Sequence, residues 1–178
     1  MSFRKLRLIS LPLVALVIGC GAVFPPLDVV ESVEPTRYIG KWYEIARYPT
    51  FFQANCASST AEYTLRDDGN IGVFNTCLAA DGTTVSTIEG VAEVVDPSTN
   101  AKLVVSFPNV PIPGSYWIID LDAAYQYAVV GDPYRSTLFI LSRTPTLDQT
   151  TLDGILNRLP SQGYDPGRLI YDAPVTAQ

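Results

Sequence analysis

The side-chain chemistry open to this chain is limited by three cysteines and by the complete absence of histidine. Without an imidazole, the Ser-His-Asp and Cys-His routes to an activated nucleophile, histidine-ligated zinc sites and imidazole acid–base catalysis are all excluded. We therefore expect no catalytic residue of these kinds, no metal site and no cofactor. The thiols of Cys20, Cys56 and Cys77 are then the side chains whose chemistry is most informative.

Cys20 ends a segment with the layout of a secretory signal. Positive charges at Arg4, Lys5 and Arg7 precede an apolar run over residues 8–18, and a glycine stands directly before the cysteine. The apolar run is shorter than the roughly 18–20 residues that a membrane-spanning helix needs. A plain signal peptide and an uncut anchor helix are the alternatives.

The sequence VIGC at 17–20 resembles the lipobox of bacterial lipoproteins. This resemblance implies that the signal peptide 1–19 is removed and that Cys20 becomes an acylated first residue. In such lipoproteins an aspartate directly after the acylated cysteine alters the sorting between membranes, and this chain has Gly21 there. In a host with two membranes, the resemblance therefore implies attachment to the periplasmic face of the outer membrane. Residues 20–35 contain prolines and have no clean period, so we expect a lipidated N-terminus and a tether.

The charge balance argues against nucleic acid as a partner. The whole chain has 12 Lys and Arg against 18 Asp and Glu. Removal of residues 1–19 takes away three basic residues and no acidic one, so 9 remain against 18 and the net charge is about −9. Such a chain is repelled by phosphate backbones and by anionic lipid. Membrane attachment would therefore depend on the lipid anchor.

With the third cysteine acylated, Cys56 and Cys77 remain in an exported, oxidising setting, which predicts a disulfide. A bridge would close a loop of about 22 residues and stabilise the fold by roughly 3 kcal/mol. If a hairpin turns at Asp68–Gly69, however, Cys77 does not directly face Cys56. The bridge then requires residues 52–58 to fold back over the strand, and two buried free thiols are the alternative.

The middle of the chain has the pattern of an all-β protein. Runs rich in Val, Ile, Thr, Tyr and Phe are separated by turn clusters such as Asp68–Gly69 and Asp81–Gly82. Short turns without intervening helices indicate an antiparallel meander, and eight strands suffice to close an up-and-down barrel around one small ligand. The expected strands are 40–47, 60–66, 71–78, 84–94, 101–107, 115–121, 125–131 and 137–143.

One helix is expected near the C-terminus, at about 147–159. Thr146 and Gln149 form a potential capping box, and Pro160 follows the last turn. The apolar stripe of this helix needs a surface to cover, and the strand 137–143 is apolar on both faces, so we expect the helix to pack outside the barrel. The stripe consists of Leu152, Ile155, Leu156 and Leu159. A short final strand is expected at 168–171.

Three segments carry a resemblance to a known family. They are GKWYEIARYP at 40–49, VVGDPYRSTLFILSRTP at 129–145 and GYDPGRLIY at 163–171. Together they resemble the lipocalins, specifically the bacterial outer-membrane lipocalins and their relatives around apolipoprotein D. Gly-Asp-Pro replaces the usual Thr-Asp-Tyr of the second segment, as in the bacterial branch. The resemblance implies a barrel with its helix over 36–172, followed by a tail at 173–178.

Trp42 and Arg143 are expected to close one end of this barrel. An indole fills the volume there, and a guanidinium over its face adds a cation–π interaction of roughly 1–2 kcal/mol when desolvated. We expect the pair to support the fold rather than to bind ligand.

The inner wall follows from strand alternation: if Trp42 points inward, so do Glu44 and Ala46. Small residues such as Ala46, Ala61 and Gly90 favour a cavity over a filled core. Glu44 and Asp120 are expected to be acidic groups inside, either as partners of tyrosine or Arg143, or as groups that repel a fatty carboxylate. By resemblance, the ligand pocket consists of Glu44, Ala46, Ala61, Tyr63, Val73, Asn75, Ile88, Gly90, Ala92, Leu103, Val105, Phe107, Tyr116, Ile118, Asp120, Tyr127 and Phe139.

The resemblance implies a membrane-anchored binding protein for a lipophilic small molecule, a single-chain lipid such as a lysophospholipid or a fatty acid, that serves envelope maintenance. One alternative is an isomerase-type enzyme of the same fold that uses a pocket thiol. Another is a pigment-binding or protein-contacting lipocalin that uses exposed aromatic residues at Phe51, Phe52 and Tyr134. A homodimer is a further possibility.

Overall fold

The structure is a computed structural model that describes residues 24–108 and 110–173. The expected signal peptide 1–19, the lipidation site Cys20 and residues 174–178 of the expected tail lie outside the described residues. The cleavage and acylation of the N-terminus therefore stay predictions.

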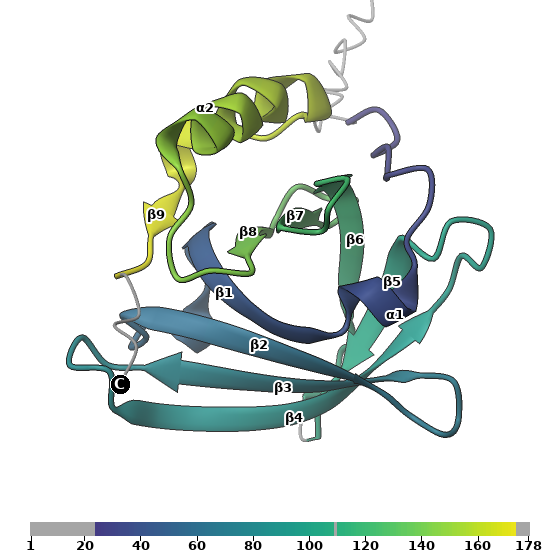
Figure 1. Cartoon of the computed structure of the whole chain (residues 1–178), viewed down its shortest axis with the longest axis horizontal. Coiled ribbons are helices and arrows are strands. Elements are labelled where there is room, and N and C mark those ends of the chain that lie inside the picture. Colours follow the sequence, from purple (N-terminus) through teal and green to yellow (C-terminus); the bar gives the residue numbers. More distant parts are fainter. Residues whose placement is uncertain (1–23, 109, 174–178) are drawn as a thin grey trace, which may run out of the picture.

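A closed antiparallel barrel forms the body of the molecule (Figure 1). Each of the first eight strands pairs with the next, and the eighth returns to the first, as the sequence predicted. A short ninth strand adds to β1. The strands are β1 (Gly40–Arg47), β2 (Ser58–Leu65), β3 (Ile71–Leu78), β4 (Thr84–Val94), β5 (Lys102–Ser106), β6 (Gly114–Leu121), β7 (Tyr127–Gly131), β8 (Leu138–Ser142) and β9 (Ile170–Tyr171).

Helices occupy the two ends of the chain and one connection. The helix expected near the C-terminus is α2 (Gln149–Arg158), but its cap differs from the prediction. Asp148, not Thr146, is the N-cap, because its carboxylate accepts a hydrogen bond from the backbone N–H of Thr151. The other helices are α1 (Pro35–Tyr38), η1 (Phe51–Gln53), η2 (Leu159–Gln162) and η3 (Pro166–Arg168).

The turns alternate between the two ends of the barrel, because consecutive strands run in opposite directions. The turns after β2, β4 and β6 lie at one end, together with α1, whose Tyr38 ring stacks 5.0 Å from that of Trp42. We call this the closed end. The connections after β1, β3, β5 and β7 lie at the other end, the open end, and the β1–β2 connection there contains η1.

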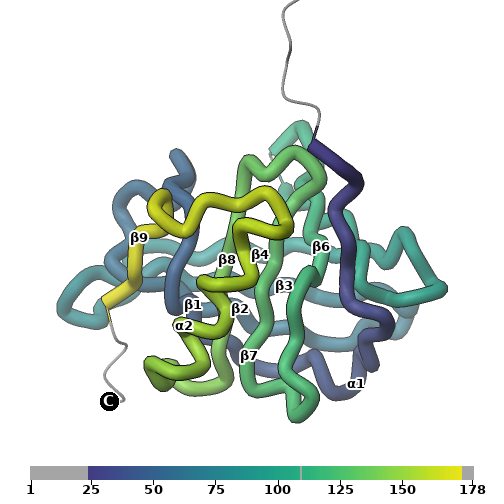
Figure 2. The backbone as a smooth tube through the Cα atoms, turned by 90° about the horizontal axis from the view of Figure 1, so that it is seen from above, coloured from purple at the N-terminus to yellow at the C-terminus, as the bar shows by residue number. Residues whose placement is uncertain are grey.

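The segment before α1 packs on the barrel, which corrects part of the expected tether at 20–35. Leu27 and Val33 are buried. The N–H of Val30 donates to the carbonyl of Ile118 in β6, and the N–H of Val33 donates to Thr99 at the closed end. Figure 2 shows this segment running beside β6. Its apolar side chains explain the packing, since exposing them would cost hydrophobic free energy.

Two apolar layers lie on opposite sides of the wall formed by β1, β6, β7 and β8. The inner layer fills the barrel around Trp42, Ile118 and Leu141. The outer layer joins the wall to α2 through Leu138, Ile140 and Ile155. The predicted placement of the helix outside the strand 137–143 is therefore confirmed.

The last strand fills a gap in the barrel wall. β1 and β2 pair from Gly40 to Tyr43 and then separate toward the open end. There β9 pairs with Ala46 and Arg47 of β1, and the N–H of Ala173 donates to the carbonyl of Ala57 just before β2. The C-terminal segment thus bridges the two strands where they diverge.

Candidate functional site

The closed end is sealed by Trp42 and Arg143. The guanidinium carbon of Arg143 lies 3.8 Å from the centre of the indole ring, and the indole N–H donates to the carbonyl of Tyr38 at 2.8 Å. Arg143 also donates to the carbonyls of Arg37, Tyr38 and Lys41. Gly40 has a φ of +94°, and a Cβ there would meet Nη1 of Arg143 at 3.4 Å. Glycine therefore provides both the backbone conformation and the room for the arginine.

Three tyrosine hydroxyls meet above this seal. Tyr116 is hydrogen-bonded to Tyr38 at 2.8 Å and to Tyr63 at 3.0 Å. Burial raises the pKa of each of these tyrosines, that of Tyr63 to about 12, so all three stay neutral at physiological pH. Tyr63 and Tyr116 were predicted lining residues, whereas Tyr38 is contributed by α1 and was not predicted.

A β-bulge in β1 corrects the predicted position of Ala46. Glu44 faces Leu141 of the inner layer, but the register then shifts, and Ala46 faces Ile140 of the outer layer. The bulge restarts the alternation, so Arg47 faces the inner residue Phe139. Ala46 belongs to the layer under α2, and the inner wall gains Arg47, which no sequence signal had indicated.

A second bulge, in β6, corrects the predicted positions of Asp120 and Tyr127. The register shifts between Ile118 and Asp120, so Asp120 points outward. Arg158 of α2 forms an ion pair with Asp120 at 2.6 Å and donates to the hydroxyl of Tyr127 at 3.1 Å. Both residues therefore join the barrel wall to the helix, and Val130, next to the bulge, lies in the inner layer.

The other predicted lining residues lie on the inner face. Ten of them form or border the inner layer: Ala61, Tyr63, Val73, Ala92, Leu103, Val105, Phe107, Tyr116, Ile118 and Phe139. Asn75, Ile88 and Gly90 face them across the ladder, with Asn75 opposite Ala61 and Ile88, and Gly90 opposite Val73.

The small residues do not all leave space. A Cβ at Gly90 would meet the Phe107 ring at 2.6 Å, so this ring fills the room that the glycine provides. A hollow of about 380 Å³ along β2, β3 and β4 is open to solvent and is lined mostly by residues of the outer face, such as Glu62, Phe74 and Glu89.

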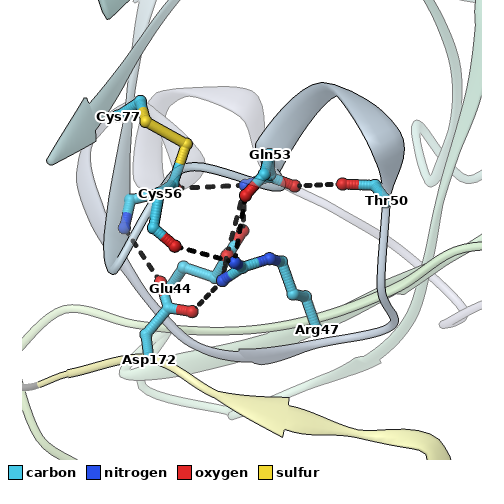
Figure 3. Close-up of polar contacts among 8 residues, drawn as sticks. Glu44, Arg47, Thr50, Gln53, Cys56, Cys77 and Asp172 are labelled. Atoms are coloured by element: carbon cyan, nitrogen blue, oxygen red, sulfur yellow. Dashed lines mark hydrogen bonds and ion pairs between the residues drawn. A yellow bond between two sulfur atoms is a disulfide. The ribbon is translucent and has the colours of Figure 1, made fainter. Parts of the chain in front are cut away.

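A polar cluster of Glu44, Arg47, Gln53, Ser59 and Asp172 lies near the open end (Figure 3). We call it the mouth cluster. The guanidinium of Arg47 donates to Glu44 at 2.8 Å and also to the carboxylate of Asp172. The amide of Gln53 donates to both oxygens of Glu44, at 3.2 and 3.1 Å, and the N–H of Ser59 donates to Asp172 at 2.8 Å. The cluster thus ties β1, the η1 connection, β2 and the C-terminal segment together.

Two carboxyl groups share one cation in this cluster, which sets their ionisation. Burial, followed by the nearby Asp172, raises the pKa of Glu44 from 4.5 to about 8, although Arg47 acts in the opposite direction. Burial also raises the pKa of Asp172, against the attraction of Arg47. Around neutral pH, Glu44 is therefore mostly protonated. The charge of Arg47 is then balanced by Asp172 alone, and the cluster is close to neutral.

The predicted disulfide between Cys56 and Cys77 is present, with the two Cα atoms 5.2 Å apart. Ser59, not Cys56, pairs directly with Cys77 in the β2–β3 ladder. The required fold of the chain before β2 is made by η1, and the carbonyl of Cys56 accepts a hydrogen bond from Arg47 at 3.1 Å. The bridge therefore holds the η1 connection against the barrel beside the mouth cluster.

Residues 24–108 and 110–173 contain neither a metal-binding cluster nor a membrane-spanning helix. In these ranges no group of three or more His, Cys, Asp or Glu side chains could hold a metal ion. No helix in the same ranges is long and apolar enough to cross a membrane.

Comparison with known proteins agrees with this architecture. A family model described as a lipocalin-like domain matches residues 33–174. The outer membrane lipoprotein Blc of Escherichia coli (strain K12) is 38% identical over 169 residues, which cover 90% of this chain and 95% of that protein. Temperature-induced lipocalin-1 of Arabidopsis thaliana is 40% identical over 151 residues, 80% of each chain.

Among solved structures, insecticyanin from the tobacco hornworm Manduca sexta has the same fold. The match has a TM-score of 0.66 at 21% sequence identity, over 84% of this chain and 85% of that one. The sequence resemblance, the closed barrel with its outer helix and the family match over residues 33–174 agree with one another. The chain belongs to the lipocalin family.

Proposed function

We propose that this lipocalin holds a single-chain lipid, a lysophospholipid or a fatty acid, with its acyl chain along the inner wall and its polar head at the mouth cluster. The observation that carries this proposal is the division of the interior. Side chains such as Leu103, Val105 and Ile118 make the wall apolar, whereas charged groups gather near the open end. Ligand sites of this kind combine an apolar lining with a few polar groups that fix orientation.

Two buried polar atoms support a polar head at this position. Among the described residues, Nε of Arg47 and Oδ1 of Asn75 are buried and have no hydrogen-bond partner. Both side chains belong to the inner face, on β1 and β3. An unpaired buried polar group costs about 1–3 kcal/mol, so a head group that accepts from one or donates to the other would recover this cost.

The energetics of transfer favour a ligand with one chain. Burial of a sixteen-carbon chain contributes about 13 kcal/mol at ~0.8 kcal/mol per methylene, but a bilayer offers nearly the same. A barrel therefore competes poorly for two-chain lipids and well for single-chain lipids that leave a membrane readily. The Phe107 ring over Gly90 would move aside or pack against the bound chain.

The electrostatics favour a zwitterionic or neutral head group. With Glu44 protonated, Arg47 is balanced by Asp172, so no net positive charge is left to attract a fatty carboxylate. The head group of a zwitterionic lysophospholipid carries one positive and one negative charge, which suits a mouth cluster that is close to neutral. We therefore rank lysophospholipid before fatty acid.

The proposed setting is the periplasmic face of an outer membrane, to which acylated Cys20 anchors the chain. The support is the lipobox-like VIGC sequence and the likeness to proteins named outer membrane lipoprotein. Storage or transport of single-chain lipid would then serve maintenance of the envelope. The isomerase-type alternative loses its nucleophile, because Cys56 and Cys77 are bridged and supply no thiolate.

Native mass spectrometry of the purified full chain, followed by titration with a fluorescent fatty acid and competition by lysophosphatidylethanolamine, tests the proposal. We expect co-purified lipid and tighter binding of the lysophospholipid. Phe139→Ala on the inner face should weaken binding about tenfold, since an aromatic side chain contributes ~1.5 kcal/mol or more of burial. Phe74→Ala, whose side chain lies on the outer face of β3, is the matched control. Absence of bound lipid together with no measurable binding would refute a carrier role.

A further inference from the structure

The most exposed large apolar side chains of the described residues gather at the open end. Phe51 is 93% exposed, Ile112 and Tyr134 are each 79% exposed, and Phe52 is 61% exposed. They lie in the β1–β2, β5–β6 and β7–β8 connections. We call these four residues the apolar rim. Large apolar side chains that are exposed together at one end of a protein are typical of an interaction site.

The open end is also poor in exposed charge. Its connections contain three charged residues by sequence, Asp81, Asp132 and Arg135. Asp132 and Arg135 are each only 4% exposed, so the exposed charges at this end are Asp81 in the β3–β4 turn and the pair Asp165 and Arg168, which lies against Tyr48 of the β1–β2 connection. The acidic residues that dominate the net charge therefore lie elsewhere, and this end can approach an anionic surface with little repulsion.

The N-terminal segment reaches the barrel at this same end. Arg135, in the β7–β8 connection, donates to the carbonyl of Pro25 at 2.8 Å, and its guanidinium lies 5.2 Å from the ring of Phe24. From there the segment runs past β6 to the closed end, where Val33 bonds to Thr99. Four residues further upstream from Phe24 stands Cys20. A chain of four residues spans at most about 14 Å when fully extended.

We infer that the open end of the barrel docks on the lipid bilayer that holds the acylated Cys20, with the apolar rim in the interfacial layer. The inference rests on the proposed anchor and adds the orientation of the barrel and its partner surface. Aromatic and aliphatic side chains bind at the boundary of head groups and acyl chains, and a tyrosine hydroxyl can remain in the polar layer. A single-chain lipid could then pass between the bilayer and the barrel without crossing bulk water.

The experiment uses the acylated full chain in vesicles of phosphatidylethanolamine and phosphatidylglycerol. A polarity-sensitive fluorophore is attached to Ile112→Cys at the open end or, as matched control, to Val95→Cys. Val95 is 52% exposed and lies in the turn after β4 at the closed end. Labelling under non-reducing conditions leaves the Cys56–Cys77 bridge intact. Half of the vesicles contain a quencher on the acyl chains of the lipid.

We expect the label at position 112 to shift to the blue and to be quenched by the lipid-borne quencher, while the label at position 95 stays water-like. In the double variant Phe51→Ser with Phe52→Ser, quenching at position 112 should decrease, and partition of the non-acylated chain onto the vesicles should fall about tenfold for each ring removed. Titration of this variant with lysophospholipid in solution should match the wild type.

Each other outcome overturns the inference. A blue shift without quenching would show that a second copy of the chain, not lipid, covers the rim. Equal quenching at both positions, or at position 95 alone, would refute the orientation. If the mass of the protein showed no acyl chains on Cys20, the anchor would be absent and this inference would be refuted. Lysophospholipid binding by the same sample would still support the ligand part of the proposed function.

Discussion

The free energy of unfolding should fall as the pH rises from 5 to 9, and Glu44→Gln should remove most of this dependence. The pKa of Glu44 is about 8 in the folded protein against an ordinary value of 4.5, because burial and the neighbouring Asp172 outweigh Arg47. Between these two values the folded chain retains a proton that the unfolded chain releases. Stability is therefore lost through this window as the pH increases.

The size of the effect follows from the gap between the two pKa values. At 1.36 kcal/mol for each pH unit, the loss between pH 4.5 and pH 8 is at most about 5 kcal/mol. The raised pKa of Asp172 acts in the same direction. Glutamine has no proton to lose and stays neutral in its buried position, so the variant should be more stable than the wild type at pH 9.

Urea unfolding of the oxidised protein at pH 5, 7 and 9 measures the effect. Glu62→Gln is the matched control, because Glu62 is an exposed carboxylate on β2 and should leave the slope of the wild type unchanged. A wild type whose stability is constant from pH 5 to 9 would refute the reasoning. A Glu44→Gln variant with the full slope of the wild type would assign the dependence to other groups.

Three further substitutions test the packing of the fold. Trp42→Ala should lower the free energy of unfolding by about 3–5 kcal/mol but change ligand affinity little, because the buried indole closes one end of the barrel. Chemical unfolding measures the stability and ligand titration measures the affinity. Unchanged stability would contradict the closing role. Replacing both Cys56 and Cys77 by serine should lower stability by about 3 kcal/mol, measured against the wild type with and without reductant. Gly131→Ala should destabilise by about 1–3 kcal/mol, because its Cβ would overlap the hydroxyl of Tyr164; an unchanged melting temperature would show that Tyr164 moves aside freely.

The period of the strands was sufficient to predict the barrel, the outer helix and most of the inner wall. Trp42, Tyr63 and Val73 point inward, as alternation requires. The errors at Ala46 and Asp120 have one physical cause. A bulge adds one residue to one strand of a pair, and its position depends on the pairing with the neighbouring strand. The alternation of residue types along a single strand therefore does not reveal it.

The polar part of the site could not be predicted for a different reason. Arg47 and Asp172 are separated by 125 positions in the chain, and only the insertion of β9 beside β1 brings them together. The sequence also offered two candidates for the N-cap of α2. The structure has Asp148 in this position and not the predicted Thr146, because the carboxylate of Asp148 accepts from the N–H of Thr151. A tertiary contact therefore brings Arg47 to Asp172, whereas the N-cap of α2 is decided by a local hydrogen bond within the first turn.

The position of β9 has a consequence for how the protein matures. Chain order is also the order of synthesis, so the seam between β1 and β2 can be completed only after every other strand has been made. A barrel without β9 therefore has a gap in its wall beside Ala46 and Arg47. Asp172 completes the wall, because its carboxylate accepts hydrogen bonds from Arg47 of β1 and from the N–H of Ser59 of β2.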